Sequence, residues 1–200
     1  MAKSSTEHIK KIRIGRAAAK LFSETGYLDT SMSEIASAAR MSKGGVFHYF
    51  SAKDEVLCFI LCNYMDLVLE RLEEDLEKIG DSFSRLQFFI SRHIELYEKN
   101  AAESRTLLHE AHNLPPKHFK ILAEKEKKYF QVLANLLLDY LGGSIPKARL
   151  TAMAFTLFGM CNWIYQWYDP KGTLTPKELS EMIFGIFSAG VNSYEQSKRA

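Results

Sequence analysis

The sequence predicts an all-α protein of about nine helices, divided into a three-helix N-terminal segment (residues 1–54) and a larger helical part (residues 55–200). Three observations lead to this fold class. Apolar residues recur at helical spacing along nearly the whole chain. Helix-capping residues, glycines and prolines divide that pattern into segments. No stretch alternates with period two for long enough to predict a sheet.

The first four helices are expected in the N-terminal third of the chain, each introduced by a recognisable signal. A serine followed three residues later by an acidic side chain forms a capping box, and a glycine after the last apolar turn stops a helix. The delimiting residues are Gly26, the pair Ser31 and Glu34, Ser42, and the pair Ser51 and Asp54. They predict helices over residues 7–25, 31–39, 42–50 and 51–78.

Five further helices follow, separated by proline and glycine signals. The breaks lie at Pro115 and Pro116, at Gly142 and Gly143, and in the turn over residues 169–172. Thr175, Pro176 and Glu178 open the last helix as cap, first position and box partner. The expected ranges are 83–99, 103–113, 117–141, 146–168 and 175 onward.

Composition excludes several classes of protein. With 46% hydrophobic and 25% charged residues, the chain is not expected to be disordered. No apolar run reaches the roughly 20 residues that a membrane span needs, and the N-terminal residues contain no apolar signal-peptide core. Three cysteines make no even disulfide framework, so we expect a cytoplasmic location. Residues 1–54 hold nine Lys and Arg against five Asp and Glu, whereas the remainder holds seventeen against nineteen. A basic N-terminal segment (residues 1–54) followed by a slightly acidic helical body (residues 55–200) is typical of a nucleic-acid-binding protein.

Residues 30–57 carry the most informative pattern. Two short helices joined by a turn form a helix-turn-helix, whose second helix fits the DNA major groove. Ser42 leaves backbone N–H groups at a helix N-terminus, where phosphates bind. Lys43, His48, Tyr49 and Lys53 are expected to face outward from this motif. A helix-turn-helix without a DNA role stays open on geometry alone.

The run TSMSEIASAARMSKGGVFHYFSAKDEVL, residues 30–57, resembles the DNA-binding signature of the TetR family. The resemblance implies phosphate contacts from Thr30, Lys43, Tyr49 and Lys53, with Gly44, Gly45, Phe47 and His48 against the groove floor. Two positions depart from the pattern. Arg40 stands where the family usually has glycine, and its cation could add a phosphate contact. Phe47 stands where tyrosine is usual, which removes one hydroxyl contact.

The body is expected to dimerise and to bind a small molecule. The last helix carries a broad apolar stripe with small residues. In TetR-like proteins the last two helices form the homodimer interface. Such a dimer would place two recognition helices on a palindromic double-stranded operator. That both helices belong to the monomer's own core stays open. Polar and aromatic residues within apolar helices are candidate ligand contacts: His93, Tyr97, His109, His112, Asn162, Trp163, Gln166 and Trp167.

Residues 162–179 (NWIYQWYDPKGTLTPKEL) are similar to TetR regulators of fatty-acid or sterol breakdown, several of which respond to acyl-coenzyme A thioesters. The resemblance therefore implies a repressor released by a lipophilic effector, such as an acyl-CoA, that tilts the fourth helix. A helical adaptor and a helical-bundle enzyme are the competing classes. No catalytic or four-ligand metal constellation can be assembled, so we expect neither enzymatic activity nor a cofactor.

Overall fold

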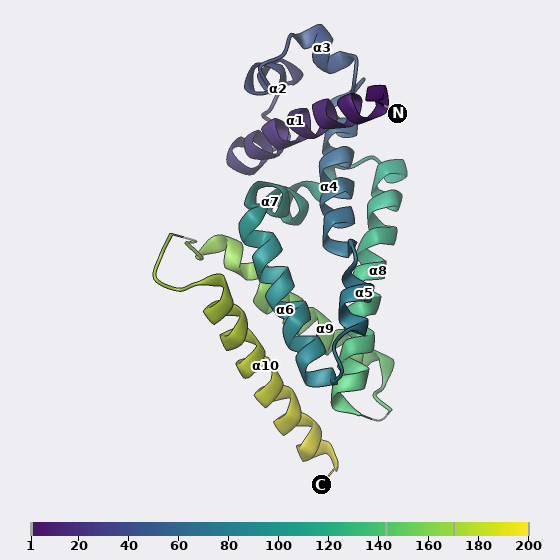
Figure 1. The fold of residues 1–200 in the computed structure, drawn as a ribbon, viewed down its shortest axis with the longest axis vertical. Helices are drawn as coiled ribbons and strands as arrows, with labels where there is room; N and C mark the ends of the chain where they lie inside the picture. Colours follow the sequence, from purple (N-terminus) through teal and green to yellow (C-terminus); the bar gives the residue numbers. More distant parts are fainter. Residues whose placement is uncertain (1, 143, 170, 200) are drawn as a thin grey trace. The chain divides into compact units, whose positions relative to one another are not determined.

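The computed structural model describes residues 2–142, 144–169 and 171–199, and within them the chain is all-helical, as predicted (Figure 1). The residues form two compact units, Met1–Leu67 with Asn100–Glu126 and Val68–Lys99 with Lys127–Ala200. The chain passes between the units within α4, between α6 and α7, and within α8. These units are defined by packing, so the predicted division of function near residue 54 stays a prediction.

The first unit is built around α1 (Ala2–Thr25), which packs against α2 (Met32–Ala38) and α7 (Ala101–Glu110) (Figure 1). Ile14 and Phe22 of α1 are fully buried, as are Ile35 of α2 and Val46 of α3 (Lys43–Phe47). These side chains clamp two short helices onto a long one, because neither α2 nor α3 buries enough apolar surface to be stable alone. The unit is completed by the start of α4 (Lys53–Leu69), by η1 (Ala111–Asn113) and by the first part of α8 (Pro116–Leu141).

The second unit is built around α6 (Ser82–Lys99), which packs against α10 (Pro176–Arg199), α9 (Lys147–Asn162) and α5 (Leu72–Glu77). Its buried stripe recurs at spacings of three and four residues, as expected for an amphipathic helix: Leu86, Phe89, Ile90, Ile94 and Tyr97. A hydroxyl pair, Ser91 and Ser180, joins α6 to α10 at 3.0 Å. A short 3₁₀ helix, η2 (Trp163–Gln166), follows α9.

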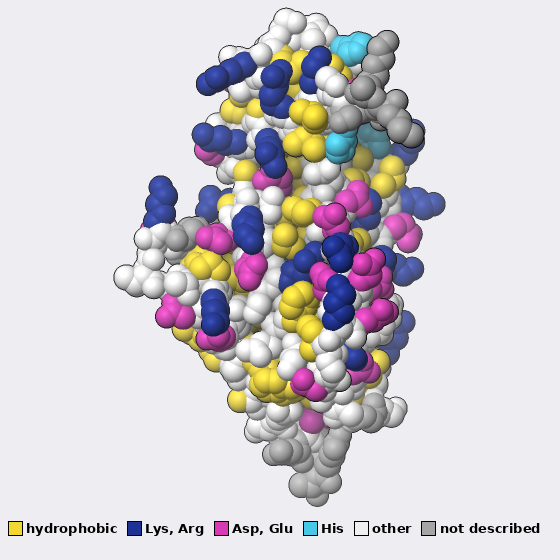
Figure 2. All heavy atoms as spheres, in the orientation of Figure 1, with side chains coloured by type: hydrophobic (Ala, Val, Ile, Leu, Met, Phe, Trp, Pro, Cys, Tyr) yellow, Lys and Arg dark blue, Asp and Glu magenta, His cyan; other side chains and the backbone are white. Residues whose placement is uncertain are grey.

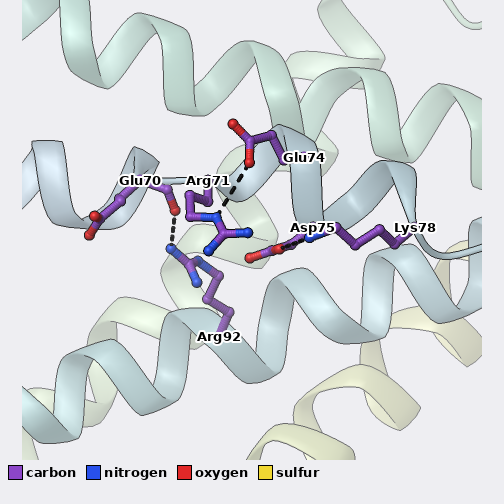
Figure 3. Close-up of polar contacts among 6 residues, drawn as sticks. All are labelled: Glu70, Arg71, Glu74, Asp75, Lys78 and Arg92. Atoms are coloured by element: carbon purple, nitrogen blue, oxygen red, sulfur yellow. Dashed lines mark hydrogen bonds and ion pairs between the residues drawn. The ribbon is translucent and has the colours of Figure 1, made fainter.

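The fourth predicted helix, 51–78, is wrong as a single element. α4 ends at Leu69, and Arg71 has a left-handed backbone (φ 54°) before α5 begins. Arg92 of α6 donates a hydrogen bond of 2.6 Å to the carbonyl of Glu70, the residue that follows the end of α4 (Figure 3). An ion pair between Arg71 and Glu74 (3.3 Å) then supports the first turn of α5.

Smaller corrections concern helix ends. The third helix is five residues long rather than nine, and the helix predicted over 146–168 consists of α9 and η2. The carboxylate that accepts from the Ser51 N–H belongs to Glu55 (2.8 Å) rather than to the predicted Asp54, whose Oδ2 lies 3.3 Å from the His118 Nδ1. The predicted stops at Gly143 and Pro170 lie outside the described residues.

Candidate nucleic-acid interface and ligand site

The start and the end of α2 are both fixed by local hydrogen bonds. The Ser31 hydroxyl accepts from the Glu34 N–H (3.2 Å), and the Glu34 carboxylate accepts from the Ser31 N–H (2.7 Å), which confirms the capping box. Hydrogen bonds with the Ser31 side chain and backbone lower the pKa of Glu34. At the other end Arg40 is left-handed (φ 53°), and the N–H groups of Arg40 and Met41 return to Ser37 and Ala36. This is a Schellman turn, normally ended by glycine.

The candidate recognition helix α3 begins at Ser42, whose hydroxyl accepts from the Gly45 N–H (3.0 Å). Val46 is its buried anchor. A Cβ at Gly44 would meet no atom of the chain within 4 Å, so the backbone there is open to an approaching molecule. A Cβ at Gly45 would lie 3.1 Å from the Ser42 hydroxyl, so this glycine also serves the cap.

The predicted contact residues of α3 and its flanks come together on one short stretch. Lys43, His48 and Arg40 are exposed, Phe47 is 43% exposed, and Tyr49 is half-buried. Ring contacts join pairs of these side chains. The rings of His48 and Tyr49 pack edge to face with centres 4.9 Å apart, and the Lys43 ammonium lies 6.0 Å from the Phe47 ring centre. The stretch therefore presents two cations, an imidazole and open backbone.

Sequence reasoning missed two lysines of α1. The ammonium groups of Lys10 and Lys11 each lie 5.9 Å from a ring centre, over Tyr49 and Phe50 respectively. Figure 2 shows Lys and Arg side chains gathered over the N-terminal helices on the face in view. The basic balance of residues 1–54 was the available signal, but it did not identify which cations lie beside α3.

Two residues expected to contact phosphates have other partners. Thr30 is buried, and its hydroxyl donates to the Gly26 carbonyl (2.8 Å) and lies 3.1 Å from the Thr25 hydroxyl. The Lys53 ammonium donates to the carbonyls of Tyr27, Leu28 and Thr30. Both side chains are therefore engaged in the loop between α1 and α2, and the phosphate contacts expected of them stay predictions.

In the second unit a polar and aromatic cluster centres on His93. Its Nδ1 lies 3.0 Å from the Tyr129 hydroxyl and its Nε2 lies 3.0 Å from the Asn162 Oδ1. Since an amide oxygen only accepts, Nε2 carries the proton and Nδ1 accepts from the Tyr129 hydroxyl. Burial lowers the pKa of His93 to about 4, and the hydrogen bond with Asn162 acts in the opposite direction. The imidazole is therefore neutral at pH 7.

Aromatic rings enclose this hydrogen-bonded chain. Tyr129 stacks on Phe89 with ring centres 4.9 Å apart, and Phe158 lies 5.6 Å from Tyr129 and 6.1 Å from His93. We define the His93 cluster as Phe89, His93, Tyr129, Phe158 and Asn162. Sequence reasoning named His93 and Asn162 but missed the three rings. Phe89 shares α6 with His93, Phe158 shares α9 with Asn162, and Tyr129 comes from α8, which is distant in sequence from both.

The other predicted ligand residues are exposed or lie elsewhere in the fold. Ile164 and Tyr168 take the buried positions after α9, Tyr165 is half-buried, and the other residues of this segment are exposed. Trp163 is 61% and Trp167 56% exposed, and Gln166 is exposed as well. Three further predicted residues are placed elsewhere: Tyr97 is buried within the second unit, and His109 and His112 are exposed on the first.

The three cysteines of the chain are not arranged with other ligands as a metal site in the part that the structure describes. The sulfur atoms of Cys58 and Cys62 lie 3.8 Å apart on α4. Burial raises the pKa of Cys58, and it raises the pKa of Cys62 and of Cys161 to about 12, so these thiols stay protonated. No group of three His, Cys, Asp or Glu residues suited to a metal occurs among the described residues. None of the helices described is long and apolar enough to cross a membrane.

Comparison with known proteins gives consistent matches over most of the chain. Residues 14–57 match the family described as bacterial regulatory proteins, tetR family, and residues 80–191 match the tetracyclin repressor-like C-terminal domain. The transcriptional repressor KstR2 of Mycobacterium tuberculosis is 22% identical over 177 residues, covering 87% of this chain and 88% of the relative. The fatty acid metabolism regulator protein of Bacillus subtilis is 31% identical over 87 residues, 44% of this chain and 45% of the relative.

Two solved structures are similar along nearly their whole length. A TetR-family regulator from Bordetella parapertussis has a TM-score of 0.83 at 29% identity, covering 90% of this chain and 93% of its own. AibR, solved with isovaleryl coenzyme A and operator DNA, has a TM-score of 0.78 at 30% identity, covering 88% of this chain and 97% of its own. Both the N-terminal and the C-terminal match lie in one family, and they include the helix-turn-helix described above. The chain therefore belongs to the TetR family of DNA-binding transcriptional regulators.

Proposed function

We propose that the protein is a cytoplasmic repressor that binds a palindromic operator as a homodimer and leaves it when a coenzyme A thioester binds. The observation that carries the DNA-binding part is the geometry of α3. Its backbone is open at Gly44, its cap leaves N–H groups at the helix start, and Lys43 and His48 are exposed. Residues 1–54 act as the DNA-binding domain in this proposal, and residues 55–200 as the effector and dimerisation domain. We propose no enzymatic activity.

The proposed contacts to DNA are those side chains of the motif that are free to reach it. Lys43, Arg40 and Tyr49 are assigned to phosphates, since each ends in a hydrogen-bond donor and none is fully buried. Ser42 offers the N-terminus of α3 to a further phosphate. Gly44, Gly45, Phe47 and His48 are assigned to the groove floor.

A homodimer through the last two helices is supported by apolar side chains left exposed on α9 and α10. Phe155 and Ile186 are each about 60% exposed, and Met182 and Tyr194 are also exposed. A Cβ at Gly185 would meet nothing within 4 Å, so a second helix can approach α10 closely there. Exposed apolar surface of this kind marks an interaction site.

A coenzyme A thioester is the proposed effector because a similar structure, AibR, was solved with one and because a relative is named as a fatty acid metabolism regulator. The His93 cluster supports this proposal with its chemistry, since apolar rings around a few oriented polar groups are typical of the lining of ligand sites. We assign the acyl chain to the rings of Phe89, Tyr129 and Phe158. His109 and His112 are left out of this proposal, and the exposed Trp163, Gln166 and Trp167 are not assigned to the acyl chain.

A gel-shift titration at several salt concentrations tests operator binding. The protein is titrated against its own upstream intergenic DNA, and tight binding to one segment that weakens steeply with salt is expected. Lys43→Ala should weaken binding and reduce the slope of log K against log [salt] by about 1. Lys120→Ala, which removes an exposed lysine of α8, is the matched control. Equal binding to all DNA, or a salt slope unchanged in Lys43→Ala, would contradict the assignment.

Thermal-shift measurements with acyl-CoAs of increasing chain length test the effector. Free coenzyme A is the control for headgroup binding alone. We expect a length-dependent rise in Tm together with loss of the gel-shift complex. A shift at no chain length would overturn the proposed ligand class, and a strengthened DNA complex would reverse the proposed direction of control.

A further inference from the structure

Lys53, the first residue of α4, has an unusually complete set of partners in the first unit. Its ammonium donates hydrogen bonds to the carbonyls of Tyr27 (2.6 Å), Leu28 (3.1 Å) and Thr30 (2.7 Å). It also lies 4.4 Å from the centre of the Tyr27 ring. An ammonium has three N–H donors, so the three carbonyls use all of them.

The three acceptors belong to the loop that joins α1 to α2. α1 ends at Thr25, and Gly26 turns the chain with a positive φ of 91°. The Thr30 hydroxyl closes the loop onto the Gly26 carbonyl, and the next residue, Ser31, is the N-cap of α2. Whatever holds the Thr30 carbonyl therefore holds the start of the helix-turn-helix.

Electrostatics favour this placement of the cation. A lysine at the N-terminus of its own helix is opposed by the helix dipole, whereas carbonyls just beyond the C-terminus of α1 attract it. A phosphate could reach the ammonium only by displacing carbonyls that already satisfy it.

We propose that Lys53 is a positioning residue for DNA binding. Its ammonium ties the α1–α2 loop to the start of α4, sets the position of α2 and α3, and does not neutralise an operator phosphate. The proposal rests on operator binding by this chain. Lys53 is also the first residue of α4 (Lys53–Leu69), so the same side chain links the start of α4 to the loop that precedes α2.

Two variants separate positioning from phosphate contact. Lys53→Met removes the cation, and we expect at least a tenfold loss of operator affinity with no change in the salt slope. Lys53→Arg keeps the charge but replaces one compact ammonium by a planar fork that cannot donate to the same three carbonyls. We expect it to lose affinity as well. A phosphate contact predicts the reverse, with the salt slope lower by about 0.9 in Lys53→Met and affinity retained in Lys53→Arg.

A third measurement uses the wild-type protein, so its outcome does not depend on whether the variants fold. Reductive methylation followed by mass spectrometry reports how accessible each lysine is, with and without operator DNA. Lys53 is expected to be protected in both states, whereas exposed Lys43 is expected to react in the free protein and to be protected on DNA. A Lys53 amine that reacts readily in the free protein overturns the proposal. If no operator is found, the proposed function fails. Protection of Lys53 in the free protein still tests whether its ammonium is held by the α1–α2 loop.

Discussion

Acidification should destabilise the protein through His93, and the size of the effect follows from its surroundings. Burial lowers the pKa of His93 to about 4, whereas an unfolded histidine titrates near 6.5. Between these values the unfolded chain binds more protons than the native one, so the free energy of unfolding falls as pH falls. Each pKa unit corresponds to about 1.4 kcal/mol, which gives about 3 kcal/mol in total and about 2 kcal/mol by pH 5.

Urea denaturation at pH 8, 7, 6 and 5 measures this effect, at one protein concentration because dimerisation contributes to stability. His93→Gln keeps a hydrogen-bonding side chain but has no titrating ring, so its free energy of unfolding should fall by about 2 kcal/mol less than that of the wild type between pH 8 and pH 5. His112→Gln controls for the loss of one imidazole at an exposed position. If wild type and His93→Gln follow the same pH dependence, the imidazole is not held neutral by burial and the reasoning is refuted.

Three further predictions concern stability and assembly. Arg40→Gly relieves a left-handed non-glycine residue and should raise the free energy of unfolding by about 0.5–1 kcal/mol, seen as a Tm about 2 °C higher; a lower Tm would count against the strain. Ser31→Ala removes the α2 cap and should cost about 1 kcal/mol in chemical denaturation, so an unchanged midpoint would show the cap to be dispensable. Ile186→Asp should convert dimer to monomer in light scattering, whereas Phe119→Asp, at an exposed apolar position of α8, should not. Dissociation of both variants, or of neither, would argue against an interface through α10.

Features set by neighbouring residues could be predicted from the sequence. The capping boxes at Ser31 and at Thr175 both form, and α1 ends at Thr25, just before Gly26, as expected, because each feature depends on residues within four positions. The all-helical class was accessible for the same reason, since apolar periodicity is itself a local property. Arg40 was recognised as standing in a position suited to glycine, and its positive φ bears that out.

Features set by distant residues could not be predicted. The break after Leu69 has no glycine or proline to announce it, and the Arg92 side chain that binds the Glu70 carbonyl lies 22 positions away. The acceptors of Lys53 lie 23 to 26 positions before it, so its basic side chain was assigned to phosphate instead.

The predicted ligand residues differ from the His93 cluster for the same reason. Tyr129 is 36 positions from His93, and nothing in the sequence marks it as a partner. Trp163 and Trp167 were grouped with Asn162 by proximity in the chain. The packing of Ile164 decides instead which side of that segment is buried.

Gly44 separates what folding needs from what recognition needs. A glycine in a helix costs up to about 1 kcal/mol relative to alanine, and a methyl group there would touch nothing in the chain. The fold itself would therefore gain from alanine at this position, and the protein forgoes that gain. Within the proposed function, the close approach of DNA to the α3 backbone supplies a steric reason for the missing side chain. Gly44→Ala should then raise the free energy of unfolding and lower the affinity for the operator. A single methyl group would thus change stability and DNA binding in opposite directions.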